Sequence, residues 1–219
     1  MRSTAISALA LAMASGASLA QIPDEDARFN AATQAVRDRN FRLAITLFQP
    51  LAEADIPDAQ FNLAVLLREG RGLPQNHVEA LYWSTLSLLS DGNYAKDLVD
   101  QLIVSLPPTA RAEVVERLLA RLKAQAEAGQ IDAPRKLARV YTELMAAPDM
   151  RLAYRWFSIC YALGDNRCLE GRADTAREIE PEDLIGVQSE ASKTFATLPF
   201  SNMTSTEADP SNAQNSKLP

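Results

Sequence analysis

The chain offers few side chains for acid–base or nucleophilic chemistry. His77 is its one histidine and lies in a polar turn at the start of a predicted helix, where a solvated side chain is expected rather than a general base. One histidine and two cysteines are too few ligands for a His- and Cys-based zinc site. Gly70-Arg71-Gly72 fits a turn between helices better than a phosphate-binding loop. We therefore expect no catalytic residues, no cofactor and no metal ion.

The two cysteines, Cys160 and Cys168, flank Gly164 between the end of one predicted helix and the start of the next. Helices that meet at such a turn can bring two Cα atoms into the range of roughly 4.4–6.8 Å that a disulfide needs. In an oxidising compartment the pair can therefore be bridged. The alternative is two free cysteines, one of them packed in the core, and the residues alone leave both possibilities open.

The composition is that of an ordinary globular protein with a strong helical bias. The 219 residues are 47% hydrophobic and 23% charged, they are rich in Ala and Leu, and they include only 8 Gly and 12 Pro. This mixture favours helices over the turn-rich strands of a sandwich or barrel. The net charge of −6 excludes the broad cationic field of a nucleic-acid-binding protein.

The first twenty residues have the pattern of a cleaved signal peptide. Arg2 precedes an apolar run of small residues from Ala5 to Ala20, and Ser18 and Ala20 have the spacing that signal peptidase recognises. The run is too short and too rich in Ala and Ser for a membrane span, which needs about 20 strongly apolar residues. We expect cleavage after Ala20 and a periplasmic or secreted protein with no membrane anchor.

An internal duplication organises the rest of the chain. A shift of 74 residues aligns the sequence with itself, and the tryptophans, Trp83 and Trp156, align after the loss of one residue. The other identities are Ala52-Glu53-Ala54 with Ala126-Glu127-Ala128, Asp58-Ala59 with Asp132-Ala133, Leu63-Ala64 with Leu137-Ala138, and Pro107 with Pro181. Matches of Glu, Asp, Leu, Pro and Trp in one register indicate a real duplication.

Helix start and stop signals divide the chain into ten helices that make five antiparallel pairs. Gly70, Gly92, Gly129 and Gly164 are expected to end helices in the left-handed conformation. The predicted domains are a signal peptide (1–20), a helical repeat domain (21–197) and a disordered tail (198–219). The predicted helices cover residues 24–38, 41–54, 58–69, 77–90, 93–105, 108–128, 132–146, 149–163, 166–179 and 181–197.

The first repeat resembles the Sel1-like repeat, a relative of the tetratricopeptide repeat. The resemblance rests on Ala59, Leu63-Ala64, the turn Gly70-Arg71-Gly72, Ala80 and Trp83. A second copy runs from Ala133 through Leu137-Ala138 and Tyr141 to Ala153 and Trp156-Phe157, with Ala147-Pro148-Asp149 in place of the glycine turn. The resemblance implies an all-α solenoid of about five helix pairs, with Ala at close helix contacts and Trp in the core.

The same resemblance bears on the cysteines and on activity. Exported cysteine-rich Sel1-like proteins have an oxidised pair at this seven-residue interval, which implies a Cys160–Cys168 disulfide. Some of these relatives are described as penicillin-binding proteins or weak β-lactamases. The Ser-x-x-Lys motif of such enzymes is missing here, since Ser189 and Lys193 are four residues apart. The activity of these relatives makes a hydrolase of β-lactam or peptidoglycan-like substrates the alternative function, and the missing motif counts against it.

The favoured function is that of an exported, non-enzymatic adaptor or regulator that binds a protein or peptide on the concave face of the helical array, and a structural spacer with no specific ligand is a third possibility. In this superfamily the first helix of each pair lines the concave face, and residues at helical spacing there should project together. An apolar residue flanked by arginines suits an extended or acidic peptide, although the apolar residues can instead pack on the neighbouring pair and leave no groove. The candidate partner-binding residues are Asp58, Phe61, Val65, Arg68, Asp132, Arg135, Arg139 and Thr142.

Overall fold

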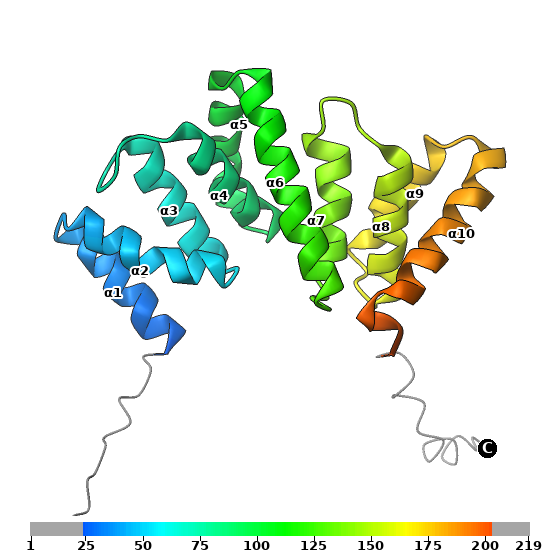
Figure 1. The fold of residues 1–219 in the computed structure, drawn as a ribbon, viewed down its shortest axis with the longest axis horizontal. Helices are drawn as coiled ribbons and strands as arrows, with labels where there is room; N and C mark the ends of the chain where they lie inside the picture. The colour runs from blue at the N-terminus through cyan, green and yellow to red at the C-terminus, as the bar shows by residue number, and fades with distance from the viewer. Residues whose placement is uncertain (1–23, 203–219) are drawn as a thin grey trace, which may run out of the picture.

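The computed structural model describes residues 24–202, and it arranges them as an arc of helices that follow one another in chain order (Figure 1). Both ends of the described chain lie on the open side of the arc. The predicted signal peptide and most of the predicted tail lie outside the described residues. The elements are α1 (Glu25–Arg37), α2 (Phe41–Glu53), α3 (Pro57–Glu69), α4 (His77–Leu89), η1 (Asn93–Ala95), α5 (Lys96–Ser105), α6 (Pro108–Glu127), α7 (Ala133–Arg139), η2 (Val140–Leu144), α8 (Met150–Ala162), α9 (Cys168–Arg177), α10 (Pro181–Thr197) and η3 (Pro199–Asn202).

The all-α solenoid predicted from the sequence is confirmed, and the helix boundaries have local causes. Asn76 accepts a hydrogen bond at its side chain from the amide of Glu79, and Asp149 does the same for Leu152, so each caps the helix that follows. Pro57, Pro108 and Pro181 occupy first helical positions, where a missing N–H costs nothing. In the described residues, ten α-helices and no strand are present.

The structure corrects the role expected for Gly92. Asp91, not Gly92, adopts the left-handed conformation after α4, with φ 67°, whereas Gly92 has φ −73°. Gly92 is required for space, because a Cβ there would lie 2.5 Å from the hydroxyl oxygen of Ser87. Gly70, Gly129 and Gly164 have positive φ, as the sequence predicts.

The core divides into two large clusters that share α6. Val114 and Leu118, in the first part of α6, belong to a cluster that extends back to α1. Leu122 and Ala126, further along the same helix, belong to a cluster that extends to the end of the described chain. The duplication is visible in both clusters, since the aligned residues are buried in each: Ala52 and Ala126, Ala59 and Ala133, Leu63 and Leu137, Ala64 and Ala138, Ala80 and Ala153, and Trp83 and Trp156.

The packed part of the chain extends beyond the predicted boundary at residue 197. Leu198 is 7% exposed and Phe200 is fully buried, and both belong to the second core cluster. The short helix η3 lies against the turn after α6, where the side chain of Pro199 is about 3.7 Å from the Cβ position of Gly129. The expected start of the tail at residue 198 is therefore wrong, because two large apolar side chains complete the core there.

The loop between α3 and α4 gives a test of this packing. Gly72 has φ +83°, and a Cβ there would lie 2.7 Å from the backbone carbonyl of Phe41 at the start of α2. We expect Gly72→Ala to lower the free energy of unfolding by about 2 kcal/mol or more, because neither backbone can yield. Gly186→Ala is the matched control, since its Cβ would meet open space within α10. That change should raise stability by about 0.5–1 kcal/mol in urea unfolding. Equal effects of the two substitutions would contradict this account.

Candidate functional site

The first four predicted partner-binding residues lie on α3 and contact the next helix pair. Asp58 accepts a hydrogen bond from the Tyr94 hydroxyl. The ring centroids of Phe61 and Tyr94 are 5.0 Å apart, in an edge-to-face arrangement. Val65 packs against the first core cluster. Arg68 donates to Gln101 on α5 at 3.5 Å and pairs with Glu69 at 3.2 Å. The geometry thus corresponds to the alternative in which these side chains pack on their neighbours.

The pKa of Tyr94 is raised at this position. Burial and then the hydrogen bond to the Asp58 carboxylate raise the pKa of Tyr94 from 10.0 to about 12. The neutral phenol can donate to Asp58 across the whole physiological range of pH. Asp58 therefore acts as the acceptor that joins α3 to η1.

The other four predicted residues lie at the start of α7, on α7 itself and in η2. Asp132 pairs with the buried ammonium of Lys136 at 2.6 Å. Arg139 donates to Glu143 at 2.9 and 3.0 Å and to the Leu88 carbonyl at 3.0 Å. Thr142 donates to backbone carbonyls of its own helix. The remaining residue, Arg135, is only 5% exposed.

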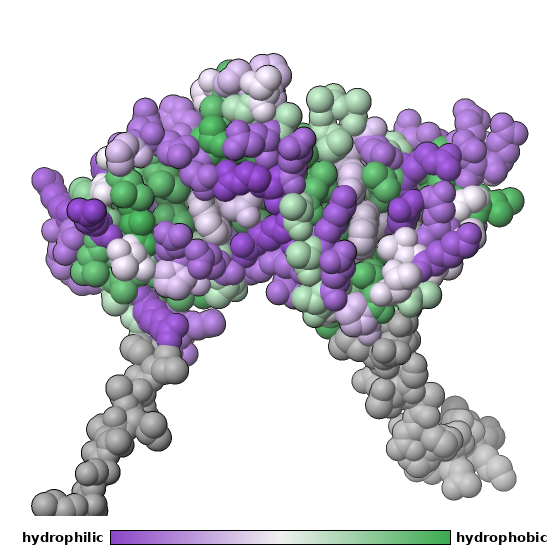
Figure 2. All heavy atoms as spheres, viewed as in Figure 1, coloured by the Kyte–Doolittle hydropathy of each residue, from purple (hydrophilic) through white to green (hydrophobic). Residues whose placement is uncertain are grey.

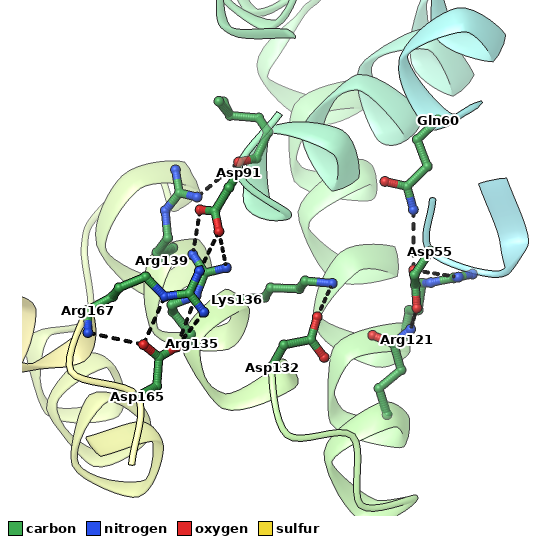
Figure 3. A network of polar contacts seen from close by, with 12 residues as sticks. Asp55, Gln60, Asp91, Arg121, Asp132, Arg135, Lys136, Arg139, Asp165 and Arg167 are labelled. Atoms are coloured by element: carbon green, nitrogen blue, oxygen red, sulfur yellow. Dashed lines mark hydrogen bonds and ion pairs between the residues drawn. The ribbon is translucent and has the colours of Figure 1, made fainter. Parts of the chain in front are cut away.

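Arg135 is the centre of an ion-pair network that joins α4, α7 and the start of α9 (Figure 3). Its two terminal nitrogens donate to the two oxygens of Asp91, each at 2.9 Å, and its Nε lies 3.6 Å from Asp165. Arg167 donates to Asp91 at 2.6 Å and to Asp165 at 2.7 and 2.8 Å. The terminal nitrogens of Arg135 are paired, whereas its buried Nε has no hydrogen-bond partner. Partner binding by Arg135 and Arg139 stays a prediction from the sequence.

A related carboxylate closes the turn after α2. Asp55 has φ 63° and accepts hydrogen bonds from Gln60 at 3.2 Å, from Arg121 at 2.9 Å and from Gln125. Arg121 and Gln125 lie on α6, so the contact ties the α2–α3 turn to the helix that both core clusters share (Figure 3). Asp55 and Asp91 thus occupy equivalent left-handed turns, and each binds side chains from a later helix pair.

The cysteines form the predicted disulfide. Cys160 and Cys168 are bonded, with their Cα atoms 6.1 Å apart, and both are buried. The bond joins the last turn of α8 to the first residue of α9 and closes the loop that contains Asp165. Asp165 is also the third member of the one group in residues 24–202 with metal-ligand spacing, but both sulfurs of that group are in the disulfide.

An open groove lies between α4, α5, the first half of α6 and the segment that follows α7. Its volume is about 580 Å³, within the usual range for ligand sites. Figure 2 shows an indentation in the upper surface of the molecule, between the α5–α6 tip and the α7–α8 loop that Figure 1 labels. The floor and walls are mainly apolar side chains: Leu81, Ile103, Val114, Val115, Leu118, Leu119, Leu144 and Met145.

Three charged side chains border the groove. Arg111 lies in the first turns of α6, and its Nε is buried without a hydrogen-bond partner. Glu116 is exposed on the same helix, and Glu143 is paired with Arg139. Within the described part of the chain, no ion pair involves Arg111, whereas Arg117 and Arg121 of the same helix bind Glu79 and Asp55. Arg111 is therefore the basic side chain in the lining of this groove, and it forms an ion pair with neither Glu116 nor Glu143.

The groove depends on an unusual ending of the α7 segment. The sequence predicts one helix over 132–146, but regular α-helix ends at Arg139 and a π-helical turn, η2, follows over Val140–Leu144. Met145 is then extended, with ψ 146°. The second repeat lacks the two-glycine turn of the first. Its first helix, α7, ends instead in a π-helical turn, which is wider than a regular α-helical turn. The widened turn places Leu144 and Met145 opposite α6.

Sequence reasoning missed the groove because residues 111–127 are rich in Glu and Arg and indicate a solvated face. The available signal was the pair of doublets Val114-Val115 and Leu118-Leu119. A doublet repeated four residues later gives a helix two adjacent apolar stripes. Val114 and Leu118 fill the core, and Val115 and Leu119 are left half-buried along the groove.

This architecture, a solenoid of stacked helix pairs with an open surface groove, defines a class of helical repeat protein, and comparison with known proteins gives the repeat type. The Sel1 repeat family model matches residues 57–88 and 135–165, which are α3–α4 and α7–α8 with the turns between them. The chain therefore contains two Sel1-like repeats, one in each half. Sel1 repeats are generally protein-interaction modules, and the family is typically non-enzymatic.

No curated protein matches the sequence. Among solved structures, a protective antigen present in uropathogenic Escherichia coli strains, which displays an SLR fold, aligns with 84% of this chain at 18% identity and a TM-score of 0.40. The alignment covers 33% of that antigen, so the present chain spans about a third of its length.

The disulfide gives a direct stability prediction. Replacing both Cys160 and Cys168 by Ala should lower the free energy of unfolding by about 2–3 kcal/mol, because the cross-link restricts a short loop of the unfolded chain. Urea unfolding measures the difference, and a reductant should destabilise the wild type but not the double variant. Two titratable thiols in the denatured wild-type protein would contradict the bridge.

The Asp165 contacts predict a pH dependence. The hydrogen bond from the Arg167 side chain holds the pKa of Asp165 below its ordinary value of 3.8, against the opposing effect of burial. A carboxyl with a lowered pKa stabilises the fold above its unfolded pKa, and this contribution is lost as pH falls through the folded pKa. Asp165→Asn should therefore lower the Tm at pH 7 and have a smaller effect at pH 3. Asp97→Asn, on the exposed side of α5, should change the Tm little at either pH. A constant Tm difference for Asp165→Asn across this range would count against the ion-pair account.

Proposed function

We propose that the protein is an exported, non-enzymatic adaptor or regulator that binds a protein or peptide partner on its helical array. The single observation that supports this function best is the open groove, whose apolar lining comes from α4, α5, α6 and η2. Concave sites of this volume, lined mainly by apolar side chains with a few polar groups, are the usual places where proteins bind ligands. A protein partner agrees with the general role of Sel1 repeats as interaction modules.

Export is supported by two independent features. The first twenty residues have the charge, length and small-residue pattern of a signal peptide, which predicts cleavage after Ala20. The Cys160–Cys168 disulfide is a bond that persists in oxidising compartments such as the periplasm. In residues 24–202, no helix combines the length and the apolar character needed to cross a membrane.

The place of binding on the array is the groove rather than the α3 and α7 residues selected from the sequence. Phe61 contacts Tyr94, and Arg135 is buried against Asp91, so binding there would require these contacts to break. Removing the acceptor of the buried Arg135 guanidinium would be costly, because the charge would be left unpaired away from water. Ligand entry into the groove breaks no ion pair of the fold.

In-cell crosslinking tests the adaptor function. The full chain with a C-terminal tag is expressed in its own host, crosslinked and purified under denaturing conditions, and the captured proteins are identified by mass spectrometry. We expect one partner enriched at least tenfold over an exported control protein of similar size. Background capture together with nitrocefin hydrolysis above the buffer rate would instead support the hydrolase alternative.

A further inference from the structure

The groove has the shape to bind a helix. On α6 it extends from Pro108 to Leu119, which at 1.5 Å per residue is a length of about 16 Å, or roughly three helical turns. Apart from Met145 and Ala146, which follow η2, its walls are helices whose backbone groups are paired along their length. The described residues contain no strand, so an extended peptide would find no strand edge for main-chain hydrogen bonds. A helix satisfies its own backbone and needs only apolar side chains on one face.

The lining defines which side chains this helix should present. Val115 and Leu119 line one wall at a spacing of one helical turn, and Leu144 and Met145 line the other. Leu144 also packs against both core clusters, so this wall is continuous with the core. Apolar residues at positions i, i+3 or i+4, and i+7 of a bound helix would enter the space between the two walls.

The basic side chain of the groove, Arg111, lies near the end where α6 begins, while Glu116 and Glu143 also border the groove. Arg111 has a buried Nε with no acceptor, and it stands in the first turns of α6, where the helix dipole is also positive. Pro107, the residue that precedes this helix, provides no side-chain cap for its free amides. A carboxylate placed there would accept hydrogen bonds from the guanidinium and complete a charge pair that the described chain lacks.

We infer that the groove binds an amphipathic helical segment of a partner protein, with apolar residues on one face and an Asp or Glu at the end that meets Arg111. The inference rests on the proposed adaptor function and specifies its ligand class. The apolar side chains provide the main binding energy, and the carboxylate sets the direction of the bound helix along α6.

Selection of peptides tests the inference without a known partner. A phage library of random 16-residue peptides is panned on the disulfide-bonded protein, and the enriched peptides are synthesised with a fluorophore. We expect a consensus with three apolar positions at helical spacing and an acidic residue near one end. Titration followed by circular dichroism should show helix formation in the peptide on binding. Failure to enrich such a consensus would overturn the inference.

Variants of the groove provide the decisive comparison. Arg111→Glu should raise the Kd for the consensus peptide at least tenfold. Exchanging the peptide's acidic residue for Lys should restore binding to this variant. Leu119→Lys should abolish binding, while Arg37→Glu, at the exposed end of α1, should leave the Kd unchanged. Unfolding curves for all three variants identify any loss caused by misfolding. Peptide affinity that is insensitive to both groove variants would refute the inference.

The same variants separate this inference from the adaptor function itself. If Leu119→Lys captures the crosslinked partner as well as the wild type does, the adaptor function stands and the helix-binding groove is wrong. If the wild type captures no partner, the adaptor function fails first. Loss of the partner in Leu119→Lys, with capture retained in Arg37→Glu, supports both.

Discussion

A buried guanidinium determines how the two halves of this solenoid meet. Arg135 is removed from water, and a charge in that position is tolerated only when opposite charges and hydrogen-bond acceptors surround it. Asp91 supplies both oxygens from the turn after α4, and Asp165 approaches from the loop before α9. Because these groups belong to three helix pairs, their pairing restricts the angle between neighbouring pairs, and hence the curvature of the arc.

The turn positions explain how a repeat protein can place such carboxylates. Asp55 and Asp91 both adopt the left-handed conformation that follows the second helix of a pair, where glycine would be the usual choice. An aspartate tolerates this conformation at a cost, and it adds a carboxylate that points towards the next pair. In the second half the equivalent turns contain Gly129 and Gly164, which have no carboxylate. There Asp165, the residue after Gly164, makes the ion pair with Arg167.

The groove is a consequence of divergence between the two halves. The first half keeps a compact turn with two glycines between α3 and α4, and Gly72 fits closely against the backbone of Phe41. The second half ends its first helix in a π-helical turn, so the loop that follows stands away from α6. Two nearly equivalent repeats therefore produce different surfaces, because a change of a few residues in a turn moves the end of a helix.

The sequence by itself determined most of the helices, the duplication and the repeat type, because helix propensity, capping and close Ala contacts are local or periodic. Thus Asn76 and Pro181 mark helix starts, and Ala64 and Ala138 are buried at equivalent positions. Only the tertiary structure decided which polar side chains are available. Arg135 and Arg111 are alike as residues in a helix, yet one is enclosed by Asp91 and the other borders an apolar groove. That difference depends on which segments meet across the array, and helical periodicity contains no information about contacts between distant segments.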